Sequence, residues 1–153
     1  MNTWRTALSM AAAPAAVSGL TSLSALAWRG RTDTASAVAP LNATSHMVWG
    51  DGALMVNRPT WRHTAVGLTL HAGSAAFWAL LYQRYLGSTA PRSLLVEAGA
   101  AALMGVAVAT VDLKLAPPRL RPGFERRLSA SSLVWVFGSL AFGLAAGALM
   151  ARR

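Results

Sequence analysis

Two kinds of residue are scarce in this sequence. It contains no cysteine, and only five of its 153 residues are acidic. The lack of cysteine excludes disulfides, thiolate metal sites and a cysteine nucleophile. Only 12% of the residues are charged, against about 25% in a typical soluble protein. Because a soluble domain needs a polar surface that this chain cannot supply, we expect a single membrane domain over residues 1–153.

Basic residues are abundant by contrast. Fourteen Lys and Arg residues give a formal net charge of +9. In a soluble protein this excess would suggest nucleic acid as the partner. Here the basic residues flank apolar runs, and no segment resembles a module that reads bases. The charge therefore indicates membrane lipids and membrane topology, and we expect no nucleic-acid partner.

The spacing of the charges divides the chain into four apolar runs. They predict helices at about 6–27, 63–84, 93–112 and 129–150. A helix of about 20 residues crosses a hydrocarbon core of about 30 Å at 1.5 Å per residue. The predicted fold class is thus all-α: a bundle of four transmembrane helices, with a short interfacial helix in the first loop.

The first run has the weakest signal of the four. It is rich in Ala and Ser, and Ala25-Leu26-Ala27 resembles a signal-peptide cleavage site. We expect the segment to be retained as a helix. Pro14 is expected to kink it, provided that a neighbouring helix satisfies the carbonyl that the proline leaves without a donor.

The loop at 28–62 begins with a flexible stretch and becomes apolar at 41–57. Asn42, Thr44 or Ser45 is expected to cap a short helix there, since such side chains accept hydrogen bonds from the first backbone N–H groups of a helix. This helix is expected to lie on the membrane surface.

The loop at 113–128 contains three prolines, which forbid a continuous helix, and the turn sequence PGF before the last helix. Its basic residues are expected to anchor the topology and to contact lipid phosphates or an acidic partner. They are Lys114, Arg119, Arg121, Arg126 and Arg127.

The distribution of basic residues predicts an orientation. With four spans, both termini and the 84–92 loop share one side, and the loops 28–62 and 113–128 share the other. The first side carries Arg5, Arg84, Arg92, Arg152 and Arg153, and the second carries Arg29, Arg31, Arg58, Arg62, Lys114, Arg119, Arg121, Arg126 and Arg127. By the positive-inside rule, the two larger loops are cytoplasmic.

Three segments carry a resemblance. The sequences NATSHMVWGD, HAGSAAFWALLY and PGFERRLS lie between residues 42 and 129. In this combination the chain resembles small multi-pass inner-membrane proteins of bacteria, an uncharacterised family. The resemblance implies the inner membrane of a bacterium and implies no activity.

Two ionisable residues lie within the predicted spans. His71 lies about 12 Å along the helix axis from His63, and Glu97 lies about one turn into its helix, near Arg84 and Arg92. Groups at such depth are candidates for function. Either His71 is a hydrogen-bonded packing residue or it belongs to a proton, substrate or metal site; we favour the first.

A metal centre is conceivable on the side of the larger loops. His46, Asp51, His63 and Asp112 offer nitrogen and oxygen ligands suitable for Zn²⁺ or Cu²⁺, although their spacing matches no recognised pattern. A structural His63–Asp112 pair is the simpler expectation. Haem is disfavoured because no second histidine lies at the depth of His71. We predict no cofactor, apart from bound lipid.

The last predicted helix contains Gly143 and Gly147 in a GxxxG spacing. Since small residues allow helices to approach closely in lipid, these two mark a packing face. That face either packs within the bundle, which we favour, or docks on another subunit.

Three functions remain open. We favour a non-catalytic accessory or structural subunit that packs against a larger membrane complex. The expected partners are membrane lipids and either other membrane subunits or further copies of this chain. The alternatives are a small oligomeric carrier or channel that uses His71 and Glu97, and a metal-handling membrane protein or enzyme. We expect no enzymatic activity, because paired carboxylates, a phosphate loop and a nucleophile elbow are all missing.

Overall fold

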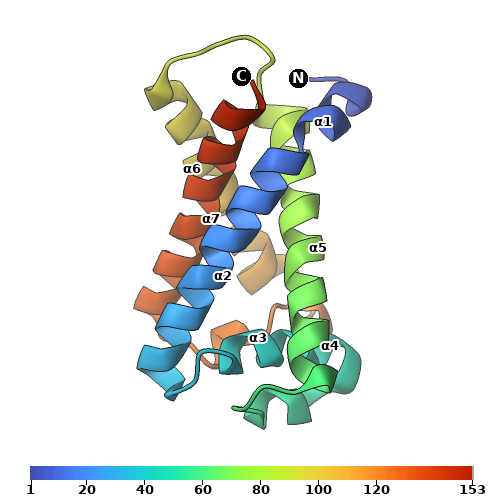
Figure 1. Cartoon of the computed structure of the whole chain (residues 1–153), viewed down its shortest axis with the longest axis vertical. Coiled ribbons are helices and arrows are strands. Elements are labelled where there is room, and N and C mark those ends of the chain that lie inside the picture. Colours follow the sequence, from blue (N-terminus) through green and yellow to red (C-terminus); the bar gives the residue numbers. More distant parts are fainter. Residues whose placement is uncertain (153) are drawn as a thin grey trace. The chain divides into compact units, whose positions relative to one another are not determined.

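The structure is a computed structural model that describes residues 1–152 (Figure 1). Arg153, which contributed to the predicted orientation, lies outside the described residues. The described chain is all-helical and contains no strand. Its α-helices are α1 (Trp4–Met10), α2 (Ala12–Thr34), α3 (Ala39–Thr44), α4 (His46–Trp49), α5 (Val66–Leu81), α6 (Leu94–Thr110) and α7 (Ala130–Ala151).

Short 3₁₀ and π-helical segments complete the elements. The 3₁₀ segments are Asp51–Met55, Pro118–Leu120 and Phe124–Arg126. The π-helical segments, Trp61–Ala65, Tyr82–Leu86 and Val111–Leu115, extend the ends of α5 and α6.

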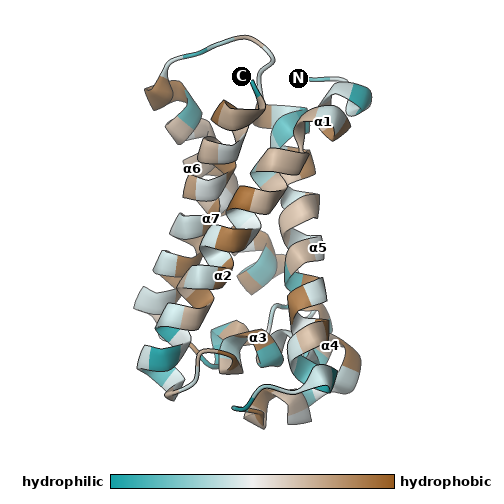
Figure 2. Ribbon diagram, viewed as in Figure 1, coloured by the Kyte–Doolittle hydropathy of each residue, from teal (hydrophilic) through white to brown (hydrophobic). Residues whose placement is uncertain are grey.

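Three helices are long and apolar enough to cross a membrane: Trp61–Leu86, Leu94–Leu115 and Ala130–Ala151. This indicates a membrane protein. The first two are longer than predicted, because the π-helical turns carry the helices past the charged residues at which the predicted spans end. Figure 2 shows the hydrophilic colour mainly near helix ends and in the short helices.

The predicted first helix is bent into two. α1 and α2 meet at an angle of 51°, and together they pass the length and hydropathy test for one broken span. The break is at Ala11, one turn before Pro14, because the proline nitrogen cannot donate to the carbonyl of Met10. Gln83 donates its side-chain N–H to that carbonyl at 3.2 Å, and so satisfies it from a neighbouring helix.

The described chain divides into two compact units. The first comprises residues 1–22, 72–108 and 137–152, and the second comprises 23–71 and 109–136. In the first unit α2 packs closely on α7. A Cβ at Gly143 would overlap the backbone of Ser18, and a Cβ at Gly147 would overlap Pro14. The Thr21 hydroxyl also donates to the carbonyl of Ser139 at 2.7 Å.

In the second unit the short helix α3 lies against α5. All six residues of α3 are buried, and a Cβ at Gly67 of α5 would overlap the carbonyl of Leu41. The expectation of side-chain capping by Asn42, Thr44 or Ser45 is wrong: α3 and α4 begin without a side-chain cap. These polar side chains bind other partners instead, because they lie inside the unit.

The segment that follows the prolines turns as predicted at Gly123, whose φ of 84° suits glycine. The last helix begins at Ala130, later than its predicted start. Ser129 precedes it, and its hydroxyl accepts from the N–H of Ser132 at 3.3 Å. The hydroxyl groups of both serines also donate to Asp33 of α2.

Candidate functional site

Glu97 lies at the centre of a charged cluster in the first unit. Its side chain is fully buried, and one carboxylate oxygen lies 2.7 Å from Arg92 and 2.7 Å from Arg152. The hydroxyl of Tyr82 donates to the other oxygen. The hydrogen bond from Arg92 to Glu97 raises the pKa of the guanidinium, so Arg92 stays charged. Both carboxylate oxygens are therefore occupied by partners within the chain.

The sequence suggested Arg84 and Arg92 as partners of Glu97, and only Arg92 takes that role. Arg84 instead lies 5.2 Å from the ring centre of Trp4 and 5.1 Å from that of Tyr85. Arg152 and Tyr82 were missed. Their positions near the ends of two other helices are the only sequence signal that would have suggested them.

The same cluster fixes the connection between α5 and α6. Arg92 donates to the carbonyl of Leu86 at 2.8 Å, and Arg152 donates to the carbonyl of Ser88 at 2.7 Å. Since each guanidinium also binds Glu97, one buried carboxylate organises the loop 87–93, in which no residue is buried.

His71 belongs to the second unit and Glu97 to the first. His71 is half-buried and is not without an interaction partner. The packing role of His71 therefore stays a prediction from the sequence.

Asn42 is the hub of a hydrogen-bond network in the second unit. It is fully buried, and its amide nitrogen donates to the carbonyls of Val56 and Arg58 at 2.9 and 3.0 Å. Its amide oxygen accepts from the hydroxyl of Thr64 at 2.8 Å. One side chain thereby ties α3 both to the extended segment before α5 and to the start of that helix.

Two of the three histidines of this unit, His46 and His63, have separate partners. His46 has one ring nitrogen 2.9 Å from the carbonyl of Arg121 and the other 3.7 Å from Asp51. His63 has Nδ1 at 3.0 Å from the hydroxyl of Ser45, which is buried.

Asp112, the fourth candidate ligand, is half-buried in the segment Val111–Leu115. Within residues 1–152, no three His, Asp or Glu side chains gather as a metal site would require. The arrangement is one of individual hydrogen bonds and ion pairs.

The basic residues of the second loop mostly bind the chain itself. Arg119 donates to the carbonyl of Met47 at 2.9 Å, and Arg121 donates to the carbonyl of Ala116 at 3.1 Å. Of the others, Arg126 pairs with Asp51 at 3.0 Å, Arg127 donates to Asn57 at 2.7 Å, and Lys114 is exposed.

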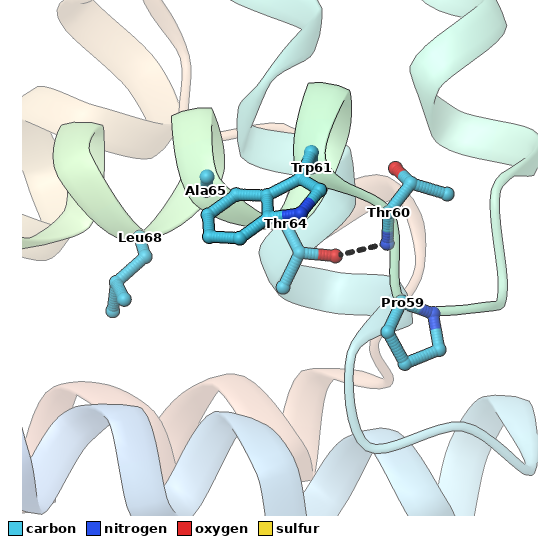
Figure 3. A pocket seen from close by; sticks show the side chains of 6 residues that line it. All are labelled: Pro59, Thr60, Trp61, Thr64, Ala65 and Leu68. Carbon is cyan, nitrogen blue, oxygen red and sulfur yellow. Dashed lines mark hydrogen bonds between the residues drawn. The ribbon is translucent and has the colours of Figure 1, made fainter.

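Two open hollows lie in the second unit. The polar hollow, of about 510 Å³, is lined by Met55, Val56, Asn57, Arg58, Thr60 and His63. The apolar groove, of about 380 Å³, is lined by Pro59, Thr60, Trp61, Thr64, Ala65 and Leu68 (Figure 3). Thr60 lines both, so the two hollows adjoin.

No protein-family model, curated protein or solved structure matches this chain. The site must therefore be interpreted from its own geometry.

Proposed function

We propose that this chain is a non-catalytic integral membrane protein that packs as an accessory subunit against a larger membrane complex. The proposed topology has four spans, with α1 and α2 forming one bent span. The short helices α3 and α4 lie near the membrane interface. The loops 28–62 and 113–128 face the cytoplasm of a bacterium whose inner membrane holds the protein.

The state of the buried polar groups supports a structural role. Glu97 has partners on both oxygens, and Asn42 binds three groups of the chain. A carrier or an enzyme needs a polar group that exchanges its partner for a substrate or a proton. In both clusters the partners belong to the protein itself. This favours a structural subunit over a carrier or an enzyme.

The observation that carries the proposal is the presence of glycine on outward faces of the spans. A Cβ at Gly73, Gly99 or Gly138 would meet nothing within 4 Å among the described residues. In lipid, small residues on a helix face serve the close approach of another helix. Gly143 and Gly147 meet α2 in this way, so the outward glycines suggest helices of a partner.

The surroundings of Gly99 fit this interpretation. Only 28% of the most apolar part of the span Leu94–Leu115 is buried. Leu95 and Val106 on the same helix are 83% and 65% exposed. A membrane complex would cover part of this apolar surface, and lipid would cover the rest.

Purification of the tagged full chain from its native cells in a mild detergent tests the proposal. We expect the wild type to co-purify in fixed ratio with other membrane subunits. Gly99→Leu should reduce that recovery at least about tenfold, since a bulky side chain prevents close helix approach. Gly52→Leu is the matched control, because a Cβ there also meets open space, but outside the three spans.

Recovery of a particle that contains only copies of this chain would contradict the proposal. That result would favour the oligomeric carrier or channel. A transport assay with His71→Ala and Glu97→Gln would then test that alternative.

A further inference from the structure

The polar hollow of the second unit presents few acceptors. The carbonyls of Val56 and Arg58 both accept from Asn42, and the carbonyl of Asn57 accepts from the hydroxyl of Ser36 at 2.6 Å. Three consecutive carbonyls are thus engaged away from a ligand. A molecule that enters this hollow meets mainly groups that donate.

The side chains of the hollow are also left as donors. The amide oxygen of Asn57 accepts from Arg127, so its NH₂ group remains to donate. The oxygen of Thr60 accepts from the backbone N–H of His63 at 3.0 Å, so its hydroxyl proton is available. Arg58 adds a positive charge, and no acidic residue is among the described residues that line the hollow.

His63 also lines the hollow, and one of its ring nitrogens is engaged within the chain. Ser45 donates its only proton to the carbonyl of Asn42 at 2.7 Å, so His63 Nδ1 must donate to Ser45 in the contact at 3.0 Å. Nε2 is the remaining ring nitrogen. It takes no part in the contact with Ser45.

The apolar groove continues from Thr60 along the first turns of the α5 span. The span begins at Trp61, whose side chain is 91% exposed, and Leu68 is 44% exposed. Figure 3 shows the Trp61 indole beside Thr64 and Ala65, with Leu68 further along the same helix. An exposed tryptophan at the start of an apolar span is typical of the membrane interface.

We propose that the polar hollow and the apolar groove form one binding site for a membrane phospholipid. The phosphate lies in the hollow near Arg58, Asn57 and His63, and an acyl chain lies in the groove beside Trp61. A free anion would use only the hollow, and an apolar helix would use only the groove. A molecule that carries both a phosphate and an acyl chain fits the two adjoining hollows. The proposal does not depend on whether the chain is an accessory subunit.

The test is titration of the full chain, purified in a non-ionic detergent, with short-chain phosphatidylglycerol. Inorganic phosphate and an alkyl maltoside of the same chain length are the comparison ligands. We expect saturable binding of the phospholipid and at least about 100-fold weaker binding of inorganic phosphate, which has no methylene groups to bury. The maltoside should bind at least about tenfold more weakly, because it has no charge.

Two variants separate the parts of the site. Arg58→Gln should weaken phospholipid binding about tenfold or more, through loss of a charge-assisted hydrogen bond. Ala65→Phe fills the groove, and should weaken phospholipid binding without changing the binding of inorganic phosphate. Arg62→Gln is the matched control: the Arg62 guanidinium lies 4.6 Å from the ring centre of Trp49, and Arg62 lines neither hollow.

Three results would overturn the proposal. The first is unchanged phospholipid binding in folded Arg58→Gln. The second is equally tight binding of inorganic phosphate, which would assign the hollow to a soluble anion. The third is equally tight binding of the maltoside, which would leave only an apolar groove. His63→Gln also removes the contact with Ser45, so Arg58→Gln carries the test.

Discussion

The two units bury polar groups in different ways. In the first, a carboxylate lies among cations, and Glu97 binds Arg92, Arg152 and the hydroxyl of Tyr82. In the second, a neutral amide lies among neutral groups, and Asn42 binds two carbonyls and the hydroxyl of Thr64.

Each cluster holds a connection between helices in place, but the two clusters differ in the cost of removing a partner. A buried charge without its partner costs far more than a buried carbonyl without a donor. The first unit should therefore be the more sensitive to loss of its central group.

The largest effect is expected for Glu97→Leu. The substitution leaves Arg92 and Arg152 without their common partner, and should lower the free energy of unfolding by about 3–5 kcal/mol. Glu97→Gln, which keeps the shape and can still bind Tyr82, should cost less. Unfolding in mixed micelles of mild detergent and SDS measures both. Equal stability of Glu97→Leu and the wild type would mean that the cluster is solvated.

Asn42→Ala is expected to have a smaller effect, of about 2–3 kcal/mol. It removes three hydrogen bonds, two to carbonyls and one from Thr64, and a neutral hydrogen bond contributes about 1 kcal/mol net. The same unfolding measurement applies. Thr64→Val removes one of these three hydrogen bonds and also the acceptor for the N–H of Thr60, so it should cost about 1–2 kcal/mol. A cost above that of Asn42→Ala would contradict the additive view of the network.

The next largest loss of stability is expected from substitutions that disturb the close packing of α2 and α7 in the first unit. Gly143→Ala places a Cβ against the backbone of Ser18, and overpacking of this kind costs about 1–3 kcal/mol. Gly99→Ala meets open space, and should leave the unfolding free energy of the isolated chain unchanged within about 0.5 kcal/mol. A similar loss in both variants would show that backbone conformation, and not close packing, limits these positions.

The smallest effect is expected at the exposed edge of the second unit. Asp51 is 69% exposed, and its carboxylate lies 3.0 Å from Arg126. Asp51→Asn should change stability by less than about 1 kcal/mol, since exposed ion pairs contribute little. The difference between the variant and the wild type should also shrink as salt is added. A loss as large as that of Asn42→Ala would mean that Asp51 is needed to orient His46.

The apolar helices could be predicted from the sequence, because span length follows from the absence of charge. The helix ends could not. The segments Tyr82–Leu86 and Val111–Leu115 contain charged residues, yet they remain helical because charged side chains near a helix end can reach partners outside the core. The sequence predicts a kink at Pro14, whereas the helix breaks at Ala11. The difference arises because a proline disturbs the helical turn before it.

The candidate site was predictable only in part. Glu97 lies five positions after its partner Arg92 in the sequence, so their pairing is local. Arg152 reaches Glu97 only through the packing of α6 and α7, which no local pattern encodes. Asn42 was mistaken for a helix cap, because a polar residue at a helix start looks the same in sequence whether it faces solvent or the interior.

The composition of the particle that the wild-type chain forms, extracted from native cells in a mild detergent, tests the central claim most directly. Native mass spectrometry of that particle gives the identity and the ratio of its subunits. The account predicts this 16.0 kDa chain in fixed ratio with at least one different membrane polypeptide. A particle that contains only this chain and lipid would contradict it.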